Sequence, residues 1–174
     1  MRAAWLFVLA LAASPALAQD AAVAALPGGA SAVSERHGSW SVDCALSETG
    51  KDCSFSQSAG NPDSGAALVA MELAAPAGNT AEGMLLTAFG LRLDAGIQLG
   101  IDGQQLGPAL PFLTCVESGC LVPLAFDEVS LSALKVGTSL EITGIKVDGG
   151  ETVTVPLSLA GFTAAYNRTA ELAK

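Results

Sequence analysis

Residues 113–126, LTCVESGCLVPLAF, carry the clearest local signal for the fold. Cys115 and Cys120 flank a polar tip, and apolar runs lie on both sides of them. If residues 116–119 form a four-residue loop, the two cysteines face each other on antiparallel strands, where facing residues lie about 4.5 to 5.5 Å apart. The stretch therefore predicts a β-hairpin whose tip is closed by a disulfide.

Similar strand-like runs follow one another along the chain, with turn signals such as Asp102-Gly103 and Asp148-Gly149 between them. This pattern is typical of an all-β fold, mainly an antiparallel β-sandwich, of which the jelly roll is one form. The predicted strands are Ser39–Ala45, Cys53–Gln57, Ala66–Leu73, Met84–Phe89, Ile97–Ile101, Phe112–Val116, Leu121–Phe126, Ser139–Val147 and Thr152–Leu157.

Two helices interrupt the strand pattern. Asp127 is a suitable N-cap for a short internal helix over residues 128–135, which stops before Gly137. A C-terminal helix is predicted over residues 162–172. Its apolar face consists of Phe162, Ala165, Tyr166 and Thr169.

The N-terminus has the three regions of a secretory signal peptide. Residues 1–18, MRAAWLFVLALAASPALA, contain one cation, an apolar run and an A-x-A cleavage site before Gln19. The apolar run is too short to cross a bilayer, which needs about 20 residues. We therefore expect export, a flexible lead over residues 19–37 that is rich in Ala, Gly and Ser, and a single β domain over residues 38–174 without an integral membrane segment.

The exported chain is acidic. Loss of Arg2 leaves 17 acidic residues and 7 of the 8 basic ones, a net charge of −10 with His neutral. A chain with this balance lacks the basic surface that nucleic acids and anionic membranes require, so neither is an expected partner.

Export also decides how the four cysteines are interpreted, because disulfides persist in oxidising compartments. Four cysteines allow three connectivities, and spacing alone does not choose among them. Local pairs, Cys44 with Cys53 and Cys115 with Cys120, are favoured because each flanks a hairpin-like turn. A zinc site would show C-x2–4-C knuckles and a thiol redox enzyme would show C-x-x-C; the spacings here, C-x8-C and C-x4-C, favour neither.

The sequence predicts no catalytic, cofactor or metal site. His37 is the only histidine and is expected to be solvated at the end of the lead, and no G-x-S-x-G elbow is present. Trp40 alternates with Val42 and is expected in the core. A carboxylate pair formed across the fold stays open as an alternative. The candidate acids are Asp43, Asp52, Asp94, Asp102, Glu117, Asp127 and Glu141.

Several stretches together resemble the invasion-associated locus B family. They are GSWSVDC (38–44), Cys53, Gln57, GIQLGID (96–102), PFLTCVESGC (111–120) and PLSLAGFTAAY (156–166). The resemblance extends from about Ser39 to Leu172. It implies an exported alphaproteobacterial protein of a largely uncharacterised family, in which a role in host-cell invasion is attributed to members from pathogens. It transfers no catalytic residues.

Two functional hypotheses follow. The first is a non-enzymatic binding or structural module, periplasmic or secreted, whose partner is a protein of the cell envelope or of a host. The second is a periplasmic hydrolase or carbohydrate-active protein with a carboxylate site. A pocket that brings two or more of the candidate acids together would favour the second, and an open surface or strand edge would favour the first.

Overall fold

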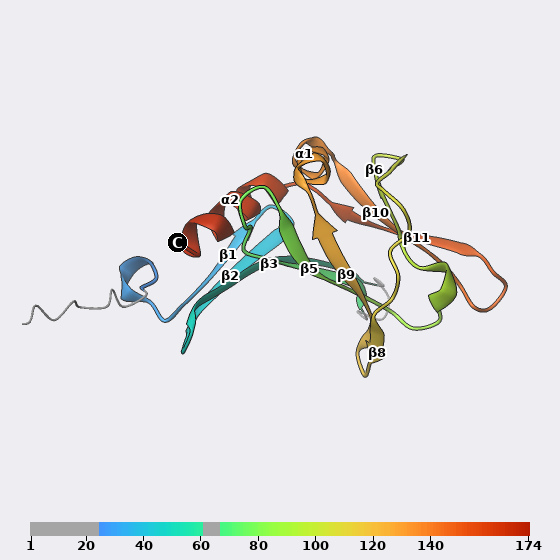
Figure 1. Ribbon diagram of the computed structural model, residues 1–174, viewed down its shortest axis with the longest axis horizontal. Helices are drawn as coiled ribbons and strands as arrows, with labels where there is room; N and C mark the ends of the chain where they lie inside the picture. Colours follow the sequence, from blue (N-terminus) through green and yellow to red (C-terminus); the bar gives the residue numbers. More distant parts are fainter. Residues whose placement is uncertain (1–24, 61–66) are drawn as a thin grey trace, which may run out of the picture.

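The computed structural model describes residues 25–60 and 67–174 (Figure 1). The predicted signal peptide, residues 1–18, and the start of the predicted lead, residues 19–24, lie outside the described residues. The described chain forms two antiparallel β-sheets and two α-helices. The prediction of a mainly antiparallel β fold with an internal and a C-terminal helix is confirmed.

The large sheet has the strand order β1-β2-β3-β4-β5-β9-β8. Its strands are β1 (Ala32–His37), β2 (Trp40–Ser47), β3 (Gly50–Gly60), β4 (Ala67–Ala74), β5 (Ala81–Thr87), β8 (Thr114–Val116) and β9 (Gly119–Phe126). From β1 to β5, neighbours in the sheet are also neighbours in the sequence. This part is a meander, in contrast to the Greek keys of a jelly roll.

The small sheet has the strand order β11-β10-β6-β7 and packs over one end of the large sheet (Figure 1). Its strands are β6 (Gln98–Ile101), β7 (Gln104–Gln105), β10 (Ser139–Ile145) and β11 (Thr152–Ser158), and short 3-10 turns lie at Pro27–Gly29 and Leu93–Ala95. All nine strands predicted from the sequence are present, with bounds that differ by three residues or fewer. The short β7 was not predicted.

The two helices have the predicted positions and caps. α1 (Glu128–Val136) begins after Asp127, whose Oδ1 accepts a hydrogen bond from the Ser130 backbone N–H at 2.8 Å. This bond satisfies one of the free N–H groups of the first turn. α2 (Phe162–Leu172) begins after Gly161, and its predicted apolar face is buried.

The core lies between the inner face of the large sheet, the small sheet and α2. Trp40 and Phe55 are fully buried on β2 and β3, and Phe162 of α2 packs between them with ring centroids 5.1 and 5.6 Å away. The Trp40 indole N–H donates to the Ser158 carbonyl at 3.0 Å, so its polar group is satisfied in the interior. The expectation that Trp40 is a core residue is confirmed.

The prediction of a flexible lead up to His37 is wrong for residues 32–37. These residues form β1, which pairs with β2 from Ala32 opposite Ala45 to His37 opposite Trp40. Polar residues occupy both faces of β1, so the sequence lacks the alternation by which a strand is recognised. Contacts with the C-terminal helix, distant in the sequence, stabilise its position, as described below.

Candidate functional site

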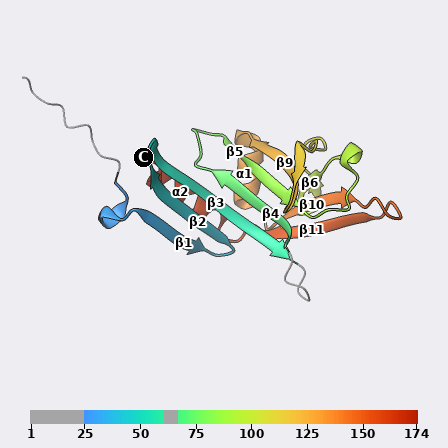
Figure 2. The ribbon, with the colours of Figure 1, turned by 90° about the horizontal axis from the view of Figure 1, so that it is seen from below.

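The outer face of the large sheet points away from the helices and the small sheet (Figure 2). Alternate side chains of a strand point to opposite faces, so Ser41 and Asp43 point outward where Trp40 and Val42 point into the core. Within residues 25–60 and 67–174, no helix or strand covers this surface, which we call the open face. Its side chains are mostly small or polar: Ser34 and Arg36 on β1; Ser41, Asp43 and Ala45 on β2; Asp52, Ser54, Ser56 and Ser58 on β3; Ala70, Glu72 and Ala74 on β4; Glu82, Met84 and Leu86 on β5; Leu121, Pro123 and Ala125 on β9.

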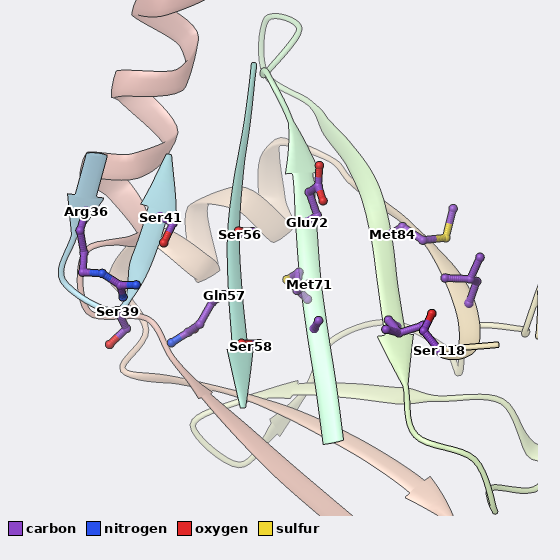
Figure 3. A pocket seen from close by; sticks show the side chains of 13 residues that line it. Arg36, Ser39, Ser41, Ser56, Gln57, Ser58, Met71, Glu72, Met84 and Ser118 are labelled. Atoms are coloured by element: carbon purple, nitrogen blue, oxygen red, sulfur yellow. The ribbon is translucent and has the colours of Figure 1, made fainter. Parts of the chain in front are cut away.

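A hollow of about 650 Å³ extends across the open face from β1 to β9. Figure 3 shows serine side chains of β2 and β3 in its middle, Arg36 on one side, and Glu72 and Met84 on the other. Gln57 also lines this hollow, although it is in phase with the inward-pointing Cys53 and Phe55, and its Oε1 is buried without a hydrogen-bond partner among the residues the structure describes. Hydroxyls both donate and accept hydrogen bonds, so the serine-lined surface suits a polar polypeptide or a sugar.

Two further hollows of the open face are lined by acidic side chains. Asp43, Asp52 and Glu72 line one of about 470 Å³, and Asp52, Glu72 and Glu82 line another of about 670 Å³. Small neighbours such as Ser54 leave the carboxylates accessible. The open face therefore combines a cation at the β1 edge, a band of serines and a row of acids.

The candidate acids predicted from the sequence have three kinds of surroundings. Asp43 and Asp52 share a hollow, whereas Glu117 lies in the exposed turn between β8 and β9. The remaining acids hydrogen-bond to nearby groups of the protein: Asp94 to Arg92, Asp102 to the Thr138 and Ser139 backbone N–H groups, Asp127 to Ser130, and Glu141 to the Gly103 N–H.

Two of these contacts explain the lowered pKa values of Asp94 and Asp127. The hydrogen bond from the Arg92 guanidinium lowers the pKa of Asp94, and the Ser130 backbone N–H lowers the pKa of Asp127. Both carboxylates are stabilised in the charged form by a local structural contact. Neither lines a hollow of the open face.

The sequence suggested that His37 is solvated, but in the structure it is partly buried and contacts Glu35. Its ring is about one quarter exposed, and Nε2 lies 3.2 Å from Oε2 of Glu35 on the same strand. Arg168 of α2 donates to both Glu35 oxygens, from Nε at 2.8 Å and from Nη2 at 2.7 Å. The Arg168 hydrogen bond lowers the pKa of Glu35 to about 2, with a smaller contribution from His37. This cluster connects β1 to α2.

The cysteines are paired within hairpins. Cys44 on β2 lies opposite Cys53 on β3, Cys115 on β8 lies opposite Cys120 on β9, and each pair is joined. The second hairpin turns more tightly than the predicted four-residue loop, because Val116 pairs with Gly119 and only Glu117 and Ser118 remain unpaired.

The described part of the chain contains no group of three or more His, Cys, Asp or Glu residues that could hold a metal ion. The same part contains no helix with the length and hydropathy of a membrane span.

Sequence reasoning missed most of the open face. Arg36, Glu72, Glu82 and the serines were not singled out. The signal that could have found them is the alternation in residues 53–58, CSFSQS, where each inward-pointing residue is followed by a serine. A serine at every outward position of a strand is an unusual pattern. Whether these serines form a surface with other residues depends on which strands are neighbours in the sheet.

Comparison with known proteins identifies a family model and relatives that the chain resembles. The family model described as "Invasion associated locus B (IalB) protein" matches residues 40–170. An invasion protein B homolog of Brucella abortus (strain 2308) is 37% identical over 155 residues, which cover 89% of each chain. Invasion protein B of Bartonella bacilliformis is 31% identical and covers 87% of this chain and 82% of its own.

A solved structure extends this similarity to the fold. The crystal structure of invasion associated protein b from Bartonella henselae is similar with a TM-score of 0.74 and 28% identity, covering 80% of this chain and 96% of that chain. The family match, the relatives and the fold agree, and they agree with the resemblance carried by the Trp40, Cys115 and Phe162 motifs. The chain belongs to the invasion associated locus B family.

Proposed function

We propose that this protein is an exported, non-enzymatic protein of the cell envelope, periplasmic or secreted, that binds a partner protein through the open face of its large sheet. The observation that carries the proposal is the open face itself. It is hollowed, lined by small and polar side chains, and uncovered by the described residues, whereas a packed sheet face would be apolar.

The predicted signal peptide and the paired cysteines support export, since disulfides persist outside the cytoplasm. The relatives named for invasion support a role in host interaction, with a partner in the cell envelope or in the host. The structural hydrogen bonds of Asp94, Asp102, Asp127 and Glu141 support a non-enzymatic role for these four of the seven candidate acids, because they occupy the carboxylates with local contacts.

The test is site-specific photo-cross-linking in intact cells of the native bacterium. A benzophenone amino acid replaces Ser56, on the open face, and in a control strain it replaces Asn167, which is exposed on α2. We expect a discrete cross-linked protein from the Ser56 position, identified by mass spectrometry, and none from the Asn167 position.

A variant strengthens this test. Ser58→Arg places a long side chain in the central hollow and should reduce cross-linking from position 56 at least tenfold. Equal products from positions 56 and 167, or no product from position 56, would overturn the assignment of the open face.

A second candidate function rests on Asp43 and Asp52, which share a hollow with Glu72. Glycoside hydrolysis uses a pair of carboxylates in this way. Screening envelope glycans for cleavage, with Asp43→Asn and Asp52→Asn as controls, tests it. Cleavage lost in both variants would replace the binding function with a catalytic one.

A further inference from the structure

A further cavity lies between the two sheets. Strands β10 and β11, which contribute to its lining, extend away from α2 (Figure 1). The volume of the cavity is about 290 Å³. The large sheet contributes residues from β4, β5 and the segment after β5, and the small sheet contributes residues from β10 and β11. Apart from Leu68, which is in phase with Ala70 at the start of β4, its lining residues do not belong to the open face, and it shares none with the three hollows there. We therefore treat it as a separate site.

The cavity is buried at its base and apolar at its mouth. Val69, Ile97 and Ile142 are 4%, 0% and 3% exposed, whereas Leu68 and Phe89 at the mouth are 37% and 60% exposed. A side chain such as Phe89 costs free energy when it is left in water. An apolar mouth that continues into an apolar interior is typical of a ligand site.

The gap between the sheets has a local cause. On the inner face of the small sheet, Gly144 lies opposite Val153 and Ile142 lies opposite Val155. A glycine and two short valines fill less space than the leucines and aromatic residues of the core near α2. A Cβ at position 144 would lie 3.0 Å from Leu91, so Leu91 packs directly on this glycine and the remaining space opens toward β11.

The charged groups at the cavity are Lys146 and Asp148. Lys146 Nζ donates to Glu151 Oε2 at 3.1 Å, in a pair whose side chains are 47% and 71% exposed. Lys146 is thus already neutralised, and Asp148 leaves the mouth with a net negative charge. A carboxylate or phosphate head would be repelled there, whereas an uncharged head would not.

We propose that this cavity binds the aliphatic chain of a small amphiphile with an uncharged head. The buried part of the lining is mostly aliphatic, with Thr87 as its polar member, and Phe89, Lys146 and Asp148 are exposed. The slot between two sheets is narrow, since packed sheets lie about 10 Å apart. A methylene group is close in size to a water molecule, which occupies ~30 Å³ in the liquid, so the cavity accommodates on the order of ten carbons. The inference is independent of the proposed function of the open face.

The test is calorimetric titration of the exported protein with neutral 1-alkanols from hexanol to dodecanol, and with the matching alkanoates. Each methylene added should tighten binding about fourfold, which corresponds to ~0.8 kcal/mol of transfer free energy. The gain should end when the chain fills the cavity. Each alkanoate should bind more weakly than its alkanol because of the net negative charge that Asp148 leaves at the mouth.

Three variants keep the test specific. Val153→Phe fills the cavity from β11, and Thr152→Phe places the same ring on the opposite face of the same strand. Val153→Phe should weaken decanol binding at least tenfold, and Thr152→Phe should leave it unchanged. Phe89→Asp, at an exposed position that tolerates substitution, should weaken binding as well even if Val153→Phe does not fold.

Flotation with phosphatidylcholine vesicles that contain diacylglycerol, a lipid with an uncharged head, distinguishes a membrane lipid from a free amphiphile as the source of the chain. Flotation of the wild type but not of Val153→Phe assigns a bilayer lipid, and absence of flotation beside tight alkanol binding assigns a free amphiphile. Affinity that does not depend on chain length, alkanoates that bind tighter than alkanols, or equal binding by Val153→Phe and the wild type would overturn the proposal.

Discussion

At the scale of single residues, Gly161 decides how closely the N-terminal and C-terminal segments approach each other. Its φ is +92°, a region that side chains with a Cβ rarely adopt. A Cβ at this position would overlap the carbonyl oxygen of His37, and the adjacent Ala160 carbonyl accepts a hydrogen bond from the Ser39 N–H at 3.0 Å. The start of α2 therefore packs directly against the turn between β1 and β2.

We predict that Gly161→Ala destabilises the protein by about 3 kcal/mol, because it combines an unfavourable φ with a backbone collision. Gly90→Ala is the matched control: Gly90 has a φ of +90°, but a Cβ added there would have no other atom within 4 Å. It should cost only the ~1 to 2 kcal/mol of the left-handed conformation. Urea unfolding measures the stability of both variants. Equal losses of stability would show that the close approach of Gly161 to His37 contributes nothing to the effect of Gly161→Ala.

At the scale of elements, two kinds of contact hold the strands in place. Short hairpins, each with a cysteine pair, organise neighbouring strands. A charged cluster of Glu35, His37, Arg168 and Glu171 connects β1 with α2, elements 133 residues apart at the Glu35–Arg168 contact. The bidentate geometry between Arg168 and Glu35 orients β1 at the sheet edge more firmly than a single contact would.

We predict that Arg168→Met lowers the dependence of stability on acid pH. The pKa of Glu35 is about 2 in the folded protein against an ordinary 4.5. Its stabilisation is therefore complete above pH 4.5 and is lost as the pH falls toward 2, where the unfolding constant rises up to tenfold per pH unit. In urea unfolding measured between pH 4.5 and pH 2, Arg168→Met should lose less stability with falling pH than the wild type does.

Lys146→Met, which removes a cation from the exposed hairpin between β10 and β11, serves as the control for that experiment. It should keep the acid dependence of the wild type. An unchanged acid dependence in Arg168→Met would mean that Glu35 does not keep its low pKa through this arginine.

We predict that non-reduced peptide mapping of the protein purified from its native bacterium finds Cys44 linked to Cys53 and Cys115 linked to Cys120. Replacing Cys115 and Cys120 together with alanine should cost about 2 to 3 kcal/mol, because the unfolded chain gains the freedom of an open loop. A peptide that links Cys44 to Cys115 or Cys120, or four free thiols, would contradict the pairing.

At the scale of the whole molecule, the two sheets and both helices share one hydrophobic core. Trp40 of the large sheet, Leu140 of the small sheet, Leu134 of α1 and Phe162 of α2 belong to the same buried cluster and are 1% exposed or less. Opposite faces of this assembly have separate roles in the proposals: the open face lies outside the sandwich, and the aliphatic cavity lies inside it. A shared core implies that these surfaces unfold together.

We predict that Leu140→Ala, in the small sheet, lowers stability by about 2 to 5 kcal/mol as reported by Trp40 fluorescence in the large sheet. In a chain without residues 1–18, Trp40 is the only tryptophan, so the tryptophan fluorescence reports only the unfolding of its surroundings. Val147→Ala, at a side chain that is 60% exposed, should change stability by less than ~0.5 kcal/mol. A transition at Trp40 that is unaffected by Leu140→Ala would show that the sheets unfold independently.

The fold was predictable wherever neighbours in the sequence decide it. Alternation placed Trp40 in the core, the Asp127 cap defined the start of α1, and the spacing of Cys115 and Cys120 indicated a hairpin. β1 was not predictable in this way, because its side chains are polar on both faces. Its strand conformation depends on pairing with β2 and on Arg168, far along the chain.

The candidate site was less predictable than the fold. Of the acids chosen from the sequence, only Asp43 and Asp52 meet in a hollow, and Glu72 beside them was not chosen. Most of the others lie beside turns or helix starts, where a carboxylate accepts backbone hydrogen bonds, as Asp102 and Asp127 do.

By itself, then, the sequence determined the mainly β fold, the two helices and the family, because alternation, caps and short motifs act over a few residues. Only the tertiary structure decided that β1 belongs to the large sheet, that serines and acids of several strands form one open face, and that Gly144, Val153 and Val155 leave a cavity between the sheets. These features depend on which strands become neighbours and how far two sheets separate, and both are set by packing between residues that are distant in the chain.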